Sequence, residues 1–257
     1  MSSGLPPILM YHGIIDVEKN FPEDREPGAS LYDLPLAVFR QHLEFLKKNN
    51  FQVNTCDSDK KKNGGKQVVL TFDDGEMNNF LHVFPMLQQY DFPAYFFITV
   101  DRIGKKGYMD WPHLKVMIQN NLIIGSHGMR HEILTKLNEA ELVQELRLSR
   151  KILEDRLQKN IFSFSVPRGF FNLRILKLAK EAGYSEIFVS GCPQNLPDEC
   201  WGRIAVKSRW GTDRLAMALE GRIPLNEKIF EAVKNTIQSC IGDENYDRWR
   251  DKILMKS

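Results

Sequence analysis

Short apolar runs alternate with longer amphipathic runs along most of this chain, and this alternation limits its fold more than any other feature. The apolar runs are residues 6–12, 68–72, 93–100, 122–127, 161–167 and 186–190. The amphipathic runs between them, 35–50, 77–91, 111–121, 138–158 and 172–183, predict helices. Strands that are apolar on both faces indicate a parallel sheet covered by helices. We expect a closed or partly closed barrel first and an open doubly wound sheet second.

Length and composition predict one globular domain of ordinary charge. The chain has 257 residues, of which 42% are hydrophobic and 26% charged, with a net charge of +2. This balance excludes a disordered or fibrous protein and supplies no basic field for nucleic acid. Residues 1–257 are therefore expected to form a single catalytic domain, with a core over about 6–210 and a helical C-terminal extension over 211–257.

The N-terminal residues "MSSGLPPILMYHGI" lack a basic segment followed by an apolar one, so no export signal is predicted. No window reaches the ~18 apolar residues that a membrane helix needs. We expect a cytoplasmic protein without an integral membrane segment, although a chain that had lost its leader would look the same. No feature predicts an oligomeric state.

Polar residues capable of chemistry follow several of the predicted strands. They are His12, the pair Asp73 and Asp74, His127 with His131 four residues later, and the run "VPRGF" at 166–170. In parallel α/β folds the carboxyl ends of the strands converge on one face, where catalytic residues gather. Residues that are distant in sequence are therefore expected to meet there.

Two histidines at i and i+4 present both imidazoles to one point if their segment is helical, and a carboxylate completes the three-ligand set of a catalytic zinc site. A divalent cation would also relieve the repulsion between two adjacent carboxylates. One of them could bind the cation while the other stays free as a general base. The alternatives are a turn at Asp-Asp-Gly, a surface histidine pair, and a core histidine at His12.

Three motifs in this order and spacing resemble those of the NodB-type polysaccharide deacetylases, a carbohydrate esterase family. They are "TFDDG" (71–75), "SHGMRH" (126–131) and "SFSVPRGFFN" (163–172). The resemblance covers roughly residues 6–210, and the pairing of the first two motifs is specific, whereas either alone is weak. It implies a distorted (β/α) barrel of about seven parallel strands with extra C-terminal helices.

The resemblance also implies roles for individual residues. Asp73 matches the general base of the family, and Asp74, His127 and His131 match its metal ligands. Zinc is the default cation for such a set, and cobalt, nickel or manganese could replace it. The segment containing Pro167 and Arg168 matches the loop whose backbone amide, here that of Arg168, helps to form the oxyanion hole.

Two departures from the family pattern concern the acid and the support of the base. No histidine follows His131, where the family usually places its general acid, and we predict that His12 takes this role, as in branches with a permuted motif order. Many members also begin the third motif with an arginine that holds the base, where this chain has Ser165. Either Arg168 or Arg203 is expected to orient Asp73 or to contact substrate.

These features predict a metal-dependent hydrolase that removes the N-acetyl group from an amino sugar of the N-acetylglucosamine type, in a polysaccharide or a glycan precursor. One alternative is a catalytically silent, carbohydrate-binding protein of the same fold. Another is an amidase or deformylase acting on a different small N-acyl sugar. A magnesium phosphohydrolase is disfavoured, since the histidine pair suits a softer metal and no phosphate-binding glycine loop is present.

Overall fold

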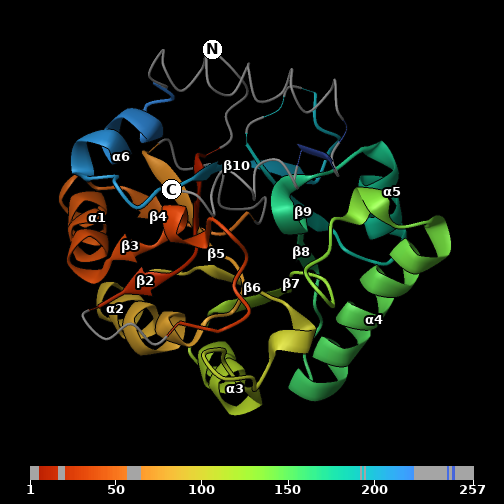
Figure 1. Cartoon of the computed structure of the whole chain (residues 1–257). Helices are drawn as coiled ribbons and strands as arrows, with labels where there is room; N and C mark the ends of the chain where they lie inside the picture. Colours follow the sequence, from red (N-terminus) through yellow and green to blue (C-terminus); the bar gives the residue numbers. More distant parts are fainter. Residues whose placement is uncertain are drawn as a thin grey trace.

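The computed structural model describes residues 6–16, 21–56, 65–191, 193, 195–222, 242, 245 and 246. In this part of the chain parallel strands form a closed ring in the order β1, β10, β9, β8, β7, β6, β5, and β1 pairs with β5 to close it (Figure 1). The ring strands are β1 (Ile8–Tyr11), β5 (Gln67–Phe72), β6 (Tyr95–Ile98), β7 (Ile123–Ser126), β8 (Ser163–Ser165), β9 (Glu186–Ser190) and β10 (Cys200–Ala205). This closed barrel confirms the predicted fold, and the open sheet is wrong.

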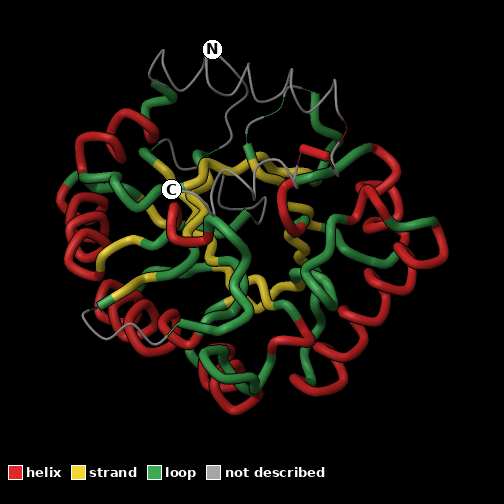
Figure 2. Tube along the Cα trace, in the orientation of Figure 1, coloured by secondary structure: helices red, strands yellow, loops and turns green. Residues whose placement is uncertain are grey.

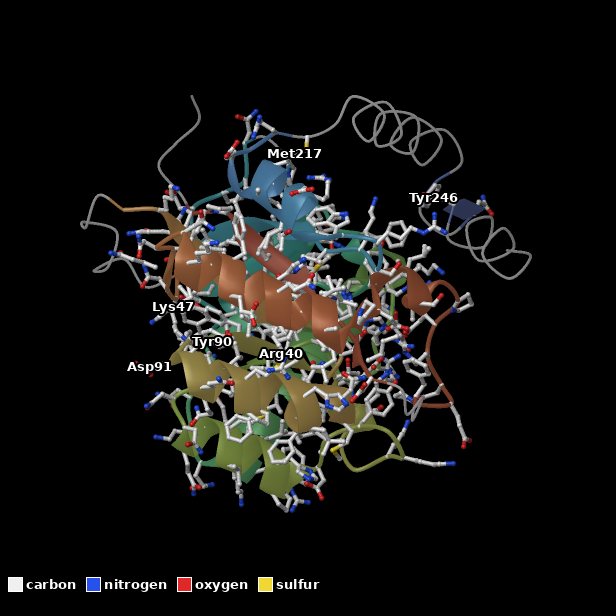
Figure 3. The ribbon with its side chains drawn as sticks, turned by 90° about the vertical axis from the view of Figure 1, so that its left-hand side faces the viewer. Arg40, Lys47, Tyr90, Asp91, Met217 and Tyr246 are labelled. Atoms are coloured by element: carbon white, nitrogen blue, oxygen red, sulfur yellow. The ribbon has the colours of Figure 1, made fainter. Side chains whose placement is uncertain are left out.

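Helices surround the barrel, as Figure 2 shows. They are α1 (Leu36–Lys48), α2 (Phe84–Tyr90), α3 (Trp111–Gln119), α4 (Glu139–Leu157), α5 (Leu173–Glu181) and α6 (Thr212–Leu219). Helix α1 contacts both α2 and α6, and the three lie side by side on one flank (Figure 3). Three short strands complete the fold: β4 (Gln52–Val53) pairs with the start of β5, while β2 (Ile14–Ile15) and β3 (Leu34–Pro35) pair with each other. Within the expected C-terminal extension, the structure describes the helix α6, and residues 223–241, 243–244 and 247–257 lie outside the described part.

The inside of the barrel changes from apolar to polar along its axis. Side chains of a strand alternate between the two faces of the sheet, so every second residue points inward. A cluster containing Val69, Tyr95, Phe97 and Phe188 fills the end where the strands begin. Toward the carboxyl ends the buried residues are polar, and Arg203 lies with its guanidinium carbon 5.4 Å from the centre of the Phe97 ring. The aromatic cluster therefore forms the floor of a polar site.

Local sequence signals account for most helix and strand boundaries, but no such signal marks strand β10. The run 138–158 begins with Asn138 and has Glu141 three residues later, a pattern that predicts a capped helix start. The structure confirms it, since Asn138 Oδ1 accepts from the Glu141 amide (3.0 Å) and Glu141 accepts from the Asn138 amide (2.9 Å). Strand β10 was not predicted, because its sequence "CWGRIA" contains a glycine and an arginine and lacks an apolar run. It completes the barrel by pairing with β9 and β1. Among the described residues, no helix is long and apolar enough to cross a membrane.

Candidate active site

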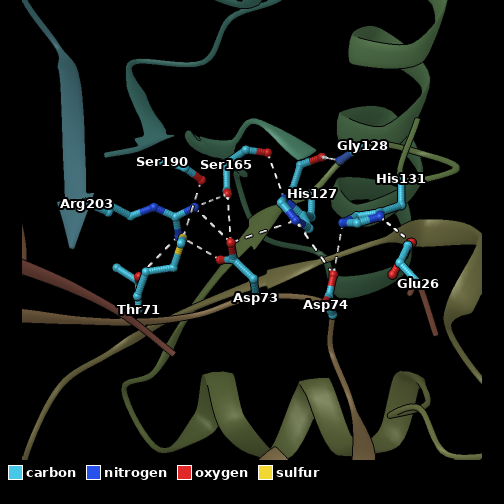
Figure 4. Close-up of polar contacts among 12 residues, drawn as sticks. Glu26, Thr71, Asp73, Asp74, His127, Gly128, His131, Ser165, Ser190 and Arg203 are labelled. Carbon is cyan, nitrogen blue, oxygen red and sulfur yellow. Dashed lines mark hydrogen bonds and ion pairs between the residues drawn. The ribbon is translucent and has the colours of Figure 1, made fainter. Parts of the chain in front are cut away.

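The carboxyl ends of the strands bring the predicted residues to one rim of the barrel, and Figure 4 shows Asp73, Asp74, His127, His131 and Arg203 among them. Strand β1 pairs with β5 in the register Tyr11 to Phe72, so His12 and Asp73 leave adjacent strands side by side. The Asp73 amide donates to the Tyr11 carbonyl at 3.0 Å, which continues the pairing beyond the strand ends. Closure of the barrel through β1 thus places the first motif beside the start of the chain.

Asp74, His127 and His131 converge as a set that could hold a metal ion. One ligand atom from each lies within 4.8 Å of those of the other two. His131 Nε2 is 3.1 Å from Asp74 Oδ1, and His127 Nε2 is 3.7 Å from the same oxygen. Two imidazole nitrogens and one carboxylate oxygen at these separations match the three-ligand donor set of a catalytic zinc site. The predicted set is therefore brought together.

A loop, and not a helix, carries the two histidines, so the helical geometry considered for the i, i+4 pair is wrong. His127 follows the last residue of β7, Gly128 has φ 78°, and His131 has φ 60°. Glu145, buried on α4, accepts hydrogen bonds from the amides of Met129 (2.7 Å) and Arg130 (2.9 Å). In a helix these amides would donate to backbone carbonyls. Here the carboxylate of Glu145 accepts from them instead, and it fixes the path of the loop.

Asp73 is bound by an arginine from β10, although its Oδ2 also lies 3.8 Å from His127 Nε2. Arg203 donates to both carboxylate oxygens, at 2.7 and 2.8 Å, and both side chains are almost fully buried. Ser165 Oγ accepts from Arg203 (2.7 Å) and lies 3.3 Å from Asp73 Oδ2. Burial alone would raise the pKa of Asp73, but the charge of Arg203 outweighs it and lowers the pKa. Asp73 is therefore ionised at neutral pH.

Of the two arginines considered for Asp73, Arg203 forms the pair. The small side chain of Ser165 joins the hydrogen-bond network of this pair. Arg168 lies in the turn Pro167–Gly169 directly after β8, with φ 60° and ψ −6°. Its backbone is thus in the left-handed region, on the same rim of the barrel as Asp73.

The two histidines of the metal set have different partners. His127 Nδ1 donates to the Ser165 carbonyl at 2.8 Å, and burial lowers its pKa to about 4. His131 Nδ1 donates to Glu26 Oε1 at 2.6 Å. Burial would lower the pKa of His131 too, but the carboxylates of Asp74 and Glu26 prevail and raise it to about 9. In each ring the bond at Nδ1 leaves Nε2 free to face the aspartates. His131 Nε2 faces Asp74, and His127 Nε2 lies between Asp74 (3.7 Å) and Asp73 (3.8 Å).

His12 lies at the same rim, against an aromatic ring. Its imidazole packs on Tyr32 with ring centres 4.9 Å apart. Its Nδ1 is buried and has no hydrogen-bond partner among the described residues. Burial opposes the ionisation of Asp74, but nearby imidazoles, His131 first and His12 next, lower its pKa well below the usual value. His12 is therefore close enough to act on the aspartates electrostatically.

Glu26 and Arg102 are site residues that the sequence did not single out. Arg102 contacts Asp74 at 3.2 Å and also binds Glu26, which accepts from His131. Glu26 belongs to a loop with several acidic residues and no motif, so no signal distinguishes it. Arg102 follows the carboxyl end of β6 by four residues, a rim position from which it could have been suspected.

Comparisons with known proteins agree with this geometry. The family model described as polysaccharide deacetylase matches residues 60–187. The YxkH protein of Bacillus subtilis strain 168, which bears the name of a polysaccharide deacetylase, is 30% identical over 184 residues, 69% of this chain and 62% of that protein. The chain belongs to the polysaccharide deacetylase family.

Other relatives carry more specific names. A peptidoglycan-N-acetylglucosamine deacetylase of Bacillus cereus is 29% identical over 50% of this chain and 58% of its own length. A poly-beta-1,6-N-acetyl-D-glucosamine N-deacetylase of Staphylococcus aureus is 24% identical over 59% of each chain. The polysaccharide deacetylase matches thus span about three fifths of the length of these curated relatives.

Solved structures of similar fold include two deacetylases. The deacetylase PplD of Streptococcus pyogenes has a TM-score of 0.71 at 19% identity, covering 84% of this chain and 99% of that chain. A polysaccharide deacetylase of Bacillus cereus has a TM-score of 0.72 at 23% identity, covering 83% of this chain and 68% of that chain. At these identities the likeness shows only that this chain shares the fold of those proteins.

Proposed function

We propose that this protein is a metal-dependent hydrolase that removes the N-acetyl group from an amino sugar of the N-acetylglucosamine type, in a polysaccharide or glycan precursor. One observation carries the proposal. Of two adjacent buried carboxylates, Asp74 faces two imidazoles while Asp73 is bound by Arg203. This division corresponds to one carboxylate for a cation and one for a proton. Membership of the polysaccharide deacetylase family supports the same reaction class.

Asp74, His127 and His131 would hold the cation. Their mixed nitrogen and oxygen donors favour zinc, with cobalt, nickel or manganese as possible replacements. When bound, a divalent cation supplies Lewis-acid chemistry, polarising an acyl carbonyl and acidifying water. The buried site keeps the three ligand side chains largely out of bulk solvent.

In the proposed reaction Asp73 and His12 transfer protons, and the backbone amide of Arg168 stabilises negative charge. Asp73, kept ionised and oriented by Arg203, accepts the proton of the attacking water. His12, on the neighbouring strand end, donates a proton to the leaving amine. The amide of Arg168, in the turn that begins at Pro167, donates to the oxyanion that develops on the carbonyl oxygen. Base and acid thus approach the scissile amide from adjacent strand ends.

The proposed substrate class rests on the names of relatives. One is named for N-acetylglucosamine in peptidoglycan and another for poly-β-1,6-N-acetylglucosamine. Both names describe an N-acetylated amino sugar within a polymer. We therefore expect acetate release from N-acetylglucosamine oligosaccharides, with the linkage as the variable to screen.

The experiment measures acetate release and zinc affinity together. Asp74→Ala should lose both zinc binding and activity, whereas Asp73→Asn should keep zinc and lose about 10²-fold or more in kcat. Chelation should abolish the parent activity and added zinc should restore it. Full activity of Asp73→Asn would refute the assignment of the base. Glycan binding without acetate release from any oligosaccharide would favour a silent carbohydrate-binding protein.

A further inference from the structure

Four charged side chains form a closed ring around one edge of the metal set. His131 Nδ1 donates to Glu26 Oε1 at 2.6 Å, and Arg102 binds the same oxygen. Arg102 Nη1 reaches Asp74 Oδ1 at 3.2 Å, and His131 Nε2 is 3.1 Å from that oxygen. Glu26 comes from the loop between β2 and β3, and Figure 4 shows it beside the edge of the His131 ring away from Asp74.

We propose that Glu26 is a positioning residue that orients His131 toward a bound cation, and that Arg102 balances its charge. This inference rests on the proposed function. Glu26 contacts Nδ1, whereas Nε2 faces Asp74, so the glutamate acts through the imidazole and is not itself a ligand of the set. A carboxylate behind a ligand imidazole fixes its tautomer and raises its basicity.

The orientation of the His131 ring depends on a side-chain partner, whereas that of the His127 ring depends on a backbone carbonyl. His127 directly follows β7, and its Nδ1 is held by the backbone carbonyl of Ser165, which no side-chain substitution removes. His131 lies in a loop with φ 60°, where neither a strand nor a helix sets the direction of its ring. Its orientation therefore depends on the side chain of Glu26 at Nδ1.

Arg102 makes a second carboxylate tolerable beside Asp74. The side chain of Arg102 is only 8% exposed, and it lies between Glu26 and Asp74, bound to both. Its guanidinium carbon is 5.3 Å from the centre of the Tyr108 ring, which supports it from outside the ring of charges. If Glu26 lost its charge, Arg102 would pair with Asp74 alone, and its positive charge would oppose a metal bound by that carboxylate.

The test measures zinc affinity by competition with a chromophoric chelator, using the full chain. Glu26→Gln should weaken zinc binding about 10- to 100-fold, and kcat should return toward the parent value at saturating zinc. Glu26→Gln combined with Arg102→Met should bind zinc more tightly than Glu26→Gln alone but less tightly than the parent. The matched control is Glu23→Gln in the same loop, whose carboxylate pairs on the surface with Lys106. It should leave zinc affinity unchanged.

The outcomes separate this inference from the proposed function. If Asp74→Ala abolishes zinc binding but Glu26→Gln binds zinc like Glu23→Gln, the inference about Glu26 is overturned and the metal site stands. If Asp74→Ala binds zinc normally, the metal site itself is wrong. If Glu26→Gln does not fold, the double variant, which leaves neither charge unpaired, replaces it, and parental zinc affinity there overturns the inference. A double variant that binds no more tightly than Glu26→Gln overturns the role of Arg102.

Discussion

Replacing Arg203 with methionine should destabilise the barrel and abolish the proposed acetate release, both through the carboxylate of Asp73. The side chains of Arg203 and Asp73 are 0% and 3% exposed, and two hydrogen bonds of 2.7 and 2.8 Å join them. Removing one partner of a buried pair leaves an uncompensated charge, at a cost of about 3–5 kcal/mol. Protonation of Asp73 limits this cost, but a protonated Asp73 can no longer accept a proton from water.

The magnitude can be checked by urea and thermal unfolding of the cation-free protein. For a chain of this size, 3–5 kcal/mol corresponds to a fall of roughly 6–20 °C in Tm. Asp73→Asn with Arg203→Met removes both charges and should be more stable than Arg203→Met alone. Lys151→Met is the control, because Lys151 and Asp155 are 70% and 62% exposed and such a pair contributes about 0–1 kcal/mol. The reasoning would be refuted if Arg203→Met had the same stability as the control. It would also be refuted if the double variant were no more stable than Arg203→Met.

Two further predictions concern histidines. His12→Gln should keep zinc affinity and lose about 10²-fold or more in kcat, measured at saturating zinc, and an unchanged kcat would assign the acid elsewhere. His42 is buried between the Tyr11 hydroxyl (3.2 Å) and the Trp210 carbonyl (3.0 Å), and burial lowers its pKa from 6.5 to about 4. The unfolded chain therefore takes up this proton first, and stability should fall by about 3 kcal/mol between pH 6.5 and 4. His42→Gln should flatten that slope in urea titrations, and an equally steep slope would contradict the assignment.

The sequence was informative where a local pattern determines the geometry. Apolar strands predict a parallel barrel, the rule that their carboxyl ends converge predicts one rim, and the Asn138 box predicts a helix start that is observed. The sequence was less informative where a side chain acts across the barrel: it left Arg203 as one of two candidate partners for Asp73 and gave no signal for Glu26. Arg203 reaches Asp73 over 130 residues from a strand without an apolar run, and Glu26 reaches His131 over 105 residues from an irregular loop.

The wrong expectation that His127 and His131 lie on a helix has the same cause, a contact from a distant part of the chain. A spacing of four residues predicts a shared face only if the backbone is helical. Here Glu145, from α4, binds the loop amides and produces the convergence by another route. The amino-acid pattern of the loop thus predicted which side chains meet, while the means of bringing them together came from a different part of the chain.

The position of β1 between β5 and β10 has a consequence for biosynthesis. During translation the ribosome releases β1 and β5 long before β10, so an unfinished chain can pair the first two strands but cannot close the ring. Asp73 lacks its arginine until that last strand arrives. A nascent protein therefore lacks the complete Asp73–Arg203 pair, and contacts of such long range are expected to make folding slow compared with helical proteins of similar size.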